Sequence, residues 1–452
     1  MESMLLMPPK SVRGMTELDR NKFNKSIKVP KLELGNSNTS SIVPYIKKYF
    51  LKMENLKPIQ NGNNTSDNSK TALLNPLLIK NWVDIEPTSR ENLVALGVNE
   101  KHFKIEELIL TYDNWRPDEI FKSVLPLDKE GISSFSKIGH IVHVNLKDHL
   151  LPYKTLIGQV LLDKVKACRT VVNKIESIDT TFRFFKMEIL CGEDNMQCQV
   201  KENHCRFEFD FSTVYWNPRL CTEHERISNM LKEGDILYDV FAGVGPFAIP
   251  CAKKKVVVLA NDLNPNSYKW LNQNAKLNKI NEHYLKTFNK DGRDFIVNDL
   301  KNDLVKRLKD NSVDSSSRIH ITMNLPALAV EFLDAFHGLF STEDLFDIKA
   351  LNPLVHVYCF AQNDFSKKIA QERMENHLGH PIDKNLCELF HVRNVSPKKD
   401  MWRVSFELTS DILFGKNSKK RKSTTEAITD TKKNCHGTKE KGSNSSEEEQ
   451  SV

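Results

Sequence analysis

The sequence predicts an α/β protein built on a doubly wound, mainly parallel sheet that is closed by an antiparallel hairpin. After Tyr215, apolar runs typical of strands alternate with helical patterns, which indicates parallel strands joined by helices. Near the end of this region two strand patterns flank the polar turn SPKKD and predict the hairpin. A small N-terminal domain and an α+β module are expected to precede the sheet.

Composition shifts divide the 452 residues into several parts, more than one typical domain would need. The expected parts are a flexible N-terminus (1–19), an N-terminal domain (20–135), an α+β middle domain (136–211), the sheet domain (212–415) and a charged tail (416–452). The tail lacks aromatic and nearly all aliphatic residues, so we expect it to be disordered. Its basic run KNSKKRK fits a nuclear import signal, a nucleic-acid tether or simply a solvated tail.

Each part has its own expected elements. In the N-terminal domain, the polar stretches 35–41 and 61–70 predict loops, whereas 42–56 and 91–125 have helical spacing. In the middle domain, strands are expected at 137–150, 170–175, 182–190 and 207–211, with a helix at 152–167. In the sheet domain, strands are expected at 236–240, 256–260, 283–288, 319–323 and 354–360, helices from 247 and 268, and the hairpin at 390–395 and 402–408.

Charge and cysteine content restrict the function classes only mildly. The net charge of +6 suits a polyanionic partner but is common among enzymes. No stretch approaches the roughly 20 apolar residues of a membrane span, and the acidic residues near the start argue against a mitochondrial presequence. Cys191, Cys198 and Cys205 recur without a C-x-x-C pair, so we expect buried or idle thiols in a reducing compartment and no metal site.

A glycine-rich segment, DVFAGVGPFA, starts at Asp239, where the first strand of the sheet passes into a helix. Its glycines follow G-x-G-x-x-A: Gly243 permits the tight turn, Gly245 lets the backbone approach a ligand, and Ala248 allows close helix packing. Asp262 ends the second strand, where a carboxylate can accept hydrogen bonds from ribose hydroxyls. The segment therefore predicts a nucleoside-containing cofactor.

Three details favour S-adenosylmethionine over a dinucleotide, which would make the protein a methyltransferase rather than a dehydrogenase. Asp239 precedes the glycines, where it can face a sulfonium or ammonium but would repel a pyrophosphate. Pro246 removes an N–H donor that a pyrophosphate would use. Asn324, Leu325 and Pro326 close a later strand at the carboxyl edge of the sheet, where ligands bind in such folds.

Several separate segments resemble the eukaryotic tRNA (guanine-37-N1)-methyltransferases, and the likeness covers about residues 8–412. The segments are PPKSVRGMTELDRNKF, KIGHIVHVNLKDHL, VYWNPRLCTEHERI, DVFAGVGPFAIP and MNLPALAVEFLDAF. The glycine loop is common to many methyltransferases, whereas YWNPRLCTEHERI together with Asn-Leu-Pro is far more specific. The resemblance implies a class I (Rossmann-like) methyltransferase domain, preceded by a tRNA-gripping N-terminal domain and a middle domain.

The resemblance also implies the roles of individual residues. Guanine N1 must lose a proton before it can attack a methyl group, so the enzyme needs a general base and a donor to O6. Glu223 resembles the base, although a helix-capping glutamate is the structural alternative. Arg183 resembles the O6 donor, although a surface arginine is the alternative.

Other site residues follow from the same resemblance. Asn324 is expected to touch the base and the cofactor, Pro326 to shape its loop, and Tyr215 to stack on the flipped base unless it is a core tyrosine. The expected cofactor-binding residues are His224, Asp239, Gly243, Gly245, Asp262, Leu263, Lys290, Asp291 and Asn324. Asp291 would lie on the adenine side, with a surface Asp-Gly turn as the alternative.

The implied function is methyl transfer from S-adenosylmethionine to N1 of guanosine 37, 3′ of the anticodon, which supports reading-frame maintenance. The resemblance implies a monomer that binds tRNA, no membrane, and locations in cytoplasm, nucleus and mitochondrial matrix. The alternatives are a methyltransferase of another RNA guanosine or of an exocyclic amine, or a catalytically silent RNA-binding relative. Asn-Leu-Pro lacks the aromatic residue expected for amino methylation, and the intact Asp239, Asp262, Glu223 and Asn324 argue against a silent relative.

Overall fold

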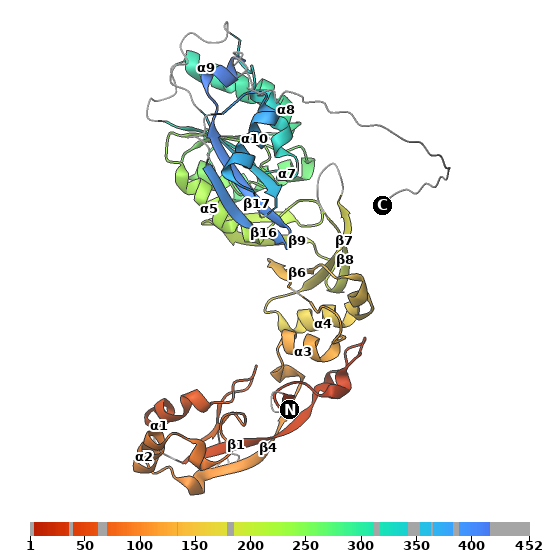
Figure 1. Ribbon diagram of the computed structural model, residues 1–452, viewed down its shortest axis with the longest axis vertical. Coiled ribbons are helices and arrows are strands. Elements are labelled where there is room, and N and C mark those ends of the chain that lie inside the picture. Colours follow the sequence, from red (N-terminus) through yellow and green to blue (C-terminus); the bar gives the residue numbers. More distant parts are fainter. Residues whose placement is uncertain are drawn as a thin grey trace, which may run out of the picture. The chain divides into compact units, whose positions relative to one another are not determined.

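The computed structural model describes residues 4–35, 39–61, 70–132, 134–178, 185–310, 317–341, 353–362, 365–382 and 388–415 (Figure 1). By its contacts the chain divides after Lys416, and the fold below concerns the part before that residue. The predicted tail and Arg183 lie outside the described residues. Within them, no helix combines the length and apolar character that a membrane span requires.

The largest element is a seven-stranded sheet with the order β13-β12-β11-β14-β15-β17-β16. Its strands are β11 Ile236–Asp239, β12 Val257–Asn261, β13 Leu285–Phe288, β14 Ile319–Met323, β15 Leu354–Ala361, β16 Glu388–Ser396 and β17 Lys399–Glu407. Strands β11 to β15 pair in parallel, and β17 runs antiparallel to both β15 and β16. The predicted doubly wound sheet with a closing hairpin is confirmed.

Both faces of this sheet are covered, which explains why its central strands are almost wholly apolar. In β11, Ile236 and Tyr238 belong to one hydrophobic core and Leu237 to the other. The helices around the sheet are α5 Cys221–Met230, α6 Ala248–Lys253, α7 Pro265–Leu277, α8 Gly292–Asp294, η10 Phe295–Leu300, α9 Lys301–Lys309, η11 Ala329–Phe336, α10 Lys367–Leu378 and α11 Ser410–Leu413. Helices α5, α6 and α7 contribute to the core of Leu237, whereas η10, α9, η11 and α10 contribute to that of Ile236.

The middle region contains a four-stranded sheet, one helix and a two-stranded hairpin. These are β5 Ser136–Ile138, β6 Ile141–Val144, α4 Lys154–Lys164, β7 Thr170–Ile178, β8 Phe185–Gly192, β9 Gln197–Glu202 and β10 Cys205–Asp210. The strand expected at 137–150 is wrong as one element, because Gly139 adopts φ +58° and turns the chain between β5 and β6. Sequence reasoning missed β9, which pairs with β10. Burial raises the pKa of the Cys198 thiol in β9 to about 12, so this thiol stays protonated.

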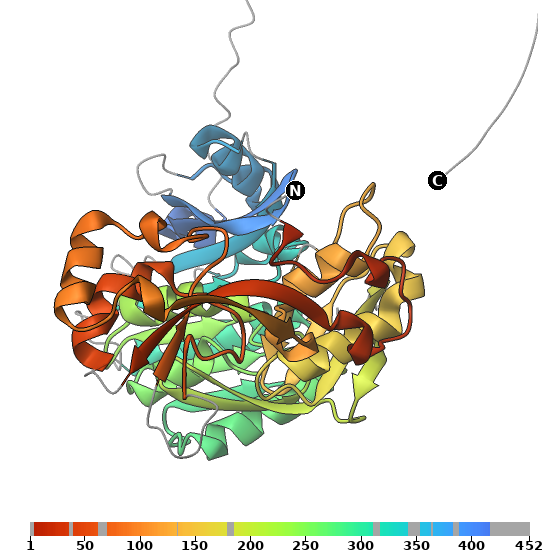
Figure 2. The same cartoon turned by 90° about the horizontal axis from the view of Figure 1, so that it is seen from below.

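The N-terminal region is organised by two long antiparallel strands, β1 Lys25–Gly35 and β4 Phe103–Leu110, which run side by side in Figures 1 and 2. With β2 Ile59–Asn61 and β3 Lys70–Leu73 they form a sheet of order β2-β3-β1-β4. The helical pattern expected through 91–125 is wrong over β4. Charged residues of β4 form cross-strand pairs with β1, with Lys31 Nζ 2.6 Å from Glu106 and Lys104 Nζ 2.5 Å from Glu33.

Short helices flank this sheet. They are η2 Lys10–Val12, η3 Arg20–Phe23, α1 Thr39–Ile46, η4 Lys47–Tyr49, η5 Trp82–Asp84, α2 Pro87–Ala95, η6 Glu100–His102, η7 Tyr112–Asn114, α3 Pro117–Val124 and η8 Asp148–Tyr153. The helix expected over 42–56 ends early, because Phe50 pairs with Leu74 as a β-bridge. Within the range expected to be flexible, Val12 is buried and Gly14 N donates to Val124 O at 2.9 Å. The domain boundaries themselves stay predictions.

Candidate active site

The glycine-rich loop lies at the carboxyl end of β11, between Asp239 and α6. Gly243 has φ +55°, and a Cβ added there would meet nothing within 4 Å, so the loop faces open space at this point. Gly245 has φ +99°, but a Cβ there would lie 2.7 Å from both Ile249 and Leu271. The close approach that the motif requires at Gly245 is therefore to the helices, and Gly243 is the glycine with room for a ligand.

Asp239 is fully buried, and across the described ranges only one of its two carboxylate oxygens accepts a hydrogen bond. Its Oδ1 accepts a hydrogen bond from Thr322 Oγ1 at 2.8 Å, whereas Oδ2 has no partner among the described residues. Burial is the main cause that raises the pKa of Asp239 to about 7; the hydrogen bond from Thr322 opposes this rise and the nearby Asp262 adds to it. Asn324, after the adjacent strand β14, also has a buried Oδ1 that finds no partner in the described part. Two unsatisfied acceptors therefore lie at neighbouring strand ends, and a cation or N–H donor would satisfy them.

Asp262, directly after β12, fixes the loop from the other side. Its Oδ2 accepts from Gly243 N at 2.8 Å and its Oδ1 from Asn264 N at 2.9 Å. Burial raises the pKa of this carboxyl to about 6, although both backbone donors lower it. A carboxylate held in this way is rigid, and it lies beside the open space at Gly243.

Asn261, which sequence reasoning missed, joins the ends of three strands. This fully buried side chain donates to Val240 O at 3.2 Å and Lys290 O at 3.0 Å, and accepts from Lys290 N at 3.0 Å. The available signal was a polar residue at the end of an otherwise apolar strand. Its bonds hold the segments after β11 and β13 against β12, so the carboxyl edge of the sheet keeps one geometry.

The outer residues of the expected cofactor set are engaged elsewhere. Lys290 Nζ lies 2.7 Å from Asp299. Asp291 is exposed and caps α8, where it accepts from Arg293 N at 2.8 Å, and Leu263 is 44% exposed. Their roles toward a cofactor stay predictions, as does the role of Arg183, which lies outside the described residues.

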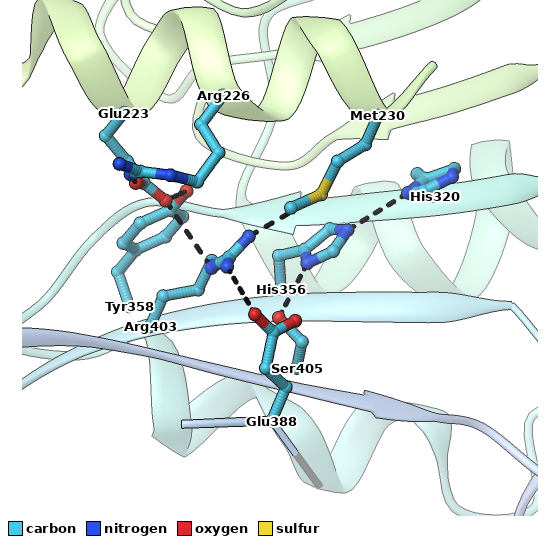
Figure 3. Close-up of polar contacts among 9 residues, drawn as sticks. All are labelled: Glu223, Arg226, Met230, His320, His356, Tyr358, Glu388, Arg403 and Ser405. Atoms are coloured by element: carbon cyan, nitrogen blue, oxygen red, sulfur yellow. Dashed lines mark hydrogen bonds and ion pairs between the residues drawn. The ribbon is translucent and has the colours of Figure 1, made fainter. Parts of the chain in front are cut away.

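Glu223 lies in the first turn of α5 and is only 3% exposed. Its carboxylate does not serve as a backbone cap, because side chains surround it (Figure 3). Tyr358 Oη donates to Oε1 at 2.9 Å, and Arg403 Nε lies 3.4 Å from the same oxygen. Arg226, one helical turn onward, binds Oε2. The sequence identified the carboxylate, whereas these three partners appear only in the fold.

Arg403 of β17 is fully buried and reaches further acceptors. Its Nη2 donates to Glu388 Oε1 at 3.1 Å and its Nη1 to Met230 Sδ at 3.6 Å. The ring of Phe390 lies 4.0 Å from the guanidinium carbon of Arg226 and 5.2 Å from that of Arg403. A buried guanidinium is costly unless it is paired, and here it bridges two carboxylates.

The carboxylate of Glu223 and the cofactor edge of the sheet meet at β15. Met323 pairs with Val357, so the next residues, Asn324 and Tyr358, lie level on adjacent strands. His224 provides a second connection: its ring packs edge-on against Phe247 of the glycine loop at 4.8 Å.

His224 is itself held by a buried partner. Its Nδ1 lies 2.5 Å from Glu202 Oε1 of β9, and both side chains are buried. Sequence reasoning placed His224 at the cofactor pocket but missed Glu202, which comes from the middle region.

Two further predicted residues are Tyr215, which precedes α5, and Pro326, which follows β14. Tyr215 is 49% exposed and its hydroxyl accepts from Asn217 Nδ2 at 3.3 Å, so it is not a core tyrosine. Pro326 O accepts from Phe360 N at 3.1 Å, which ties the Asn-Leu-Pro turn to β15. The arrangement thus combines open space at Gly243, unsatisfied acceptors for a cationic group, and the buried carboxylate of Glu223.

Comparisons with known proteins agree on one family. The model of the TRM5/TYW2 methyltransferase domain matches residues 198–380, and that of the TYW2 N-terminal domain matches 118–195. The chain is 53% identical to the tRNA (guanine(37)-N(1))-methyltransferase of Drosophila melanogaster, over 90% of this chain and 88% of the relative. It is 44% identical to the enzyme of the same name from Xenopus tropicalis, over 94% of this chain and 86% of the relative.

Solved structures show the same fold at lower identity. The crystal structure of Trm5b from Pyrococcus abyssi has a TM-score of 0.56 at 22% identity, and covers 84% of this chain and 98% of that chain. A complex of aTrm5 with tRNALeu has a TM-score of 0.56 at 21% identity, and covers 85% of this chain and 100% of that chain.

Proposed function

The chain belongs to the tRNA (guanine(37)-N(1))-methyltransferase family, and we propose that Glu223 is the base of the reaction that defines this family. The enzyme transfers a methyl group from S-adenosylmethionine to N1 of guanosine 37 in tRNA. The observation that carries the assignment of Glu223 is its burial beside β15, one strand from Asn324.

The residues present fit S-adenosylmethionine, which supplies an activated methyl group on a sulfonium. The unsatisfied Oδ2 of Asp239 suits the positive charge of this cofactor, and the open space at Gly243 leaves room for it. Asp262, held by two backbone donors, would accept from ribose hydroxyls, and His224 would form part of the wall beside Phe247. The remaining residues proposed for the cofactor are Gly245, Leu263, Lys290, Asp291 and Asn324.

Glu223 performs the proton step. Guanine N1 is a poor nucleophile while it carries its proton, so the carboxylate removes that proton as N1 attacks the methyl carbon. A carboxylate on a packed helix loses little freedom when the base arrives, and positioning of this kind supplies much of the rate. Asn324 would orient the guanine against the cofactor, with Pro326 shaping the turn.

Two residues complete the proposed guanine site. Arg183 would donate to O6 as negative charge moves onto it. Tyr215, half exposed before α5, would stack on the flipped base, because N1 lies on the pairing edge and is reached only outside the stack.

Family resemblance supports further properties as proposals. We propose that the protein acts as a monomer in cytoplasm, nucleus and mitochondrial matrix, and that its product supports reading-frame maintenance. Light scattering of the pure protein tests the monomeric state, and cell fractionation with antibody detection tests the locations.

The function is tested with anticodon stem-loop transcripts that carry G37 or A37 and with labelled S-adenosylmethionine. We expect label on the G37 transcript, recovered as 1-methylguanosine after nuclease digestion, and none on A37. Equal labelling of both, or recovery of an N2-methylated product, would overturn the assignment.

A further inference from the structure

We infer that Arg403, anchored by Glu388, is a positioning residue that holds the Glu223 carboxylate in its reactive orientation. The inference rests on the proposed role of Glu223 as the base. Arg403 Nε lies 3.4 Å from Glu223 Oε1, and Nη2 donates to Glu388 Oε1 at 3.1 Å (Figure 3). One guanidinium therefore links the proposed base to a second carboxylate on the neighbouring strand.

The two oxygens of Glu223 are held by partners of very different mobility. Oε1 accepts a hydrogen bond from Tyr358 and forms an ion pair with Arg403, whose Nε makes no hydrogen bond within the described residues; both side chains are fully buried on strands of the sheet. Oε2 is bound by Arg226, whose side chain is 33% exposed. Moving Arg226 breaks its contact with the Phe390 ring but returns the guanidinium to solvent, whereas moving Arg403 would leave a charge unpaired in the buried interior. Oε1 is therefore the fixed oxygen, and Oε2 is the one that becomes free to face guanine N1 when Arg226 moves.

Arg403 is placed for this task more than for stability. Burying an ion pair costs several kcal/mol of desolvation, and replacement by apolar residues is often neutral or stabilising. Here the fully buried arginine contacts the proposed base, and Met230 Sδ and the ring of Phe390 pack against the rest of its head group. Glu388, whose side chain is 55% exposed, pairs with the far end, while the burial of Arg403 itself limits how far the guanidinium can turn from Glu223.

The charges around Glu223 set the sign of a pH test. Arg226 on α5, Tyr358 on β15, Arg403 on β17, with Glu388 on β16 behind it, face the carboxylate, and Asp239 on β11 interacts with the same tyrosine. Removing the charge of Arg403 disfavours the ionised carboxylate, so activity should require higher pH. Removing the charge of Glu388 strengthens the pull of Arg403, so the acidic limb should move to lower pH.

The test measures the single-turnover rate against pH, at saturating tRNA and S-adenosylmethionine, for R403M, R403K and E388Q. We expect R403M to fall roughly tenfold or more with its acidic limb at higher pH, and R403K to recover part of the rate. E388Q should move the acidic limb of the pH–rate profile to lower pH. The matched controls are R307M, which breaks the Arg307–Asp303 pair of α9, and E372Q on α10, and both should keep the wild-type profile.

A double-mutant cycle with E223Q separates the base role of Glu223 from the positioning role of Arg403. If Arg403 acts through Glu223, R403M should add almost nothing once Glu223 is replaced. Additive losses would overturn the positioning role while leaving the base assignment intact, whereas a wild-type rate for E223Q would overturn the base assignment itself. If R403M fails to fold, R403K and E388Q decide: unmoved acidic limbs in both would overturn the inference.

Discussion

The two halves of the active site differ in how completely their carboxylates are satisfied. Asp239, on the cofactor side, is buried with one oxygen unpartnered, and burial raises its pKa to about 7. Glu223, on the side proposed for the guanine, is equally buried but contacts two arginines and a tyrosine. Among the described residues Asp239 thus has no cationic partner, and a positively charged ligand can supply one. Glu223 is already paired with the side chains of Arg226 and Arg403. The carboxylate of Asp239 should therefore respond to cofactor binding, whereas that of Glu223 is already paired within the protein.

Glu223→Gln should cause the largest loss of activity among these variants. A parallel loss of cofactor binding would show that the two carboxylates do not act separately. The substitution keeps the size of the side chain and removes the base, so kcat should fall by roughly 10²–10⁴ while the Kd for S-adenosylmethionine stays near the wild-type value. Quench-flow and calorimetry measure the two quantities. Glu372→Gln, on the exposed side of α10, is the control; a cofactor Kd that rises in parallel with the loss of kcat would contradict the separation of the halves.

Asp239→Asn should weaken cofactor binding and leave the rate at saturating cofactor largely intact. Thr322 Oγ1 still donates to the side-chain oxygen, so the new amide points its N–H groups into the site and repels a cation. Cofactor affinity should fall by about 30-fold or more, as for one member of a buried charge pair. At saturating cofactor the rate should recover largely. A variant that binds the cofactor normally but cannot turn over would show that Asp239 belongs to the chemical step instead.

The smallest expected effect is the pH dependence of stability, which should come from the buried carboxyls on the cofactor side. Because the folded pKa of Asp239 is raised, the cofactor-free folded protein binds a proton more tightly than the unfolded chain does. Its stability should therefore fall as pH rises toward about 7, by roughly 1 kcal/mol per pH unit, and level off above that. Asp262, raised to about 6, acts with the same sign at lower pH. Cofactor affinity should show the opposite trend, since the cation prefers the ionised carboxylate.

Thermal unfolding between pH 5.5 and 8.5, with and without S-adenosylmethionine, tests this prediction. Asp239→Asn should flatten the cofactor-free curve near pH 7 and raise stability at pH 8, because no buried charge then forms. An unchanged slope in that variant would assign the effect to other groups whose folded pKa is raised, of which Asp262, with a pKa of about 6, is the first to replace.

The cofactor edge could be found from the sequence because its signals are local. Parallel strands joined by helices bring their carboxyl ends to one edge, so Asp239, Asp262 and Asn324 had to lie near one another once the alternation was recognised. Gly243 and Gly245 both marked the turn, although only the packing of Ile249 and Leu271 shows which glycine faces open space.

What surrounds Glu223 was decided by the tertiary structure alone. In β17, apolar Trp402, Val404 and Phe406 alternate with Arg403 and Ser405, a pattern that normally places the polar residues in water. Period-two alternation separates the faces of a strand but does not say what covers each face. Helix α5 covers the polar one, so an arginine that looks solvated in sequence becomes fully buried against a carboxylate from a distant segment.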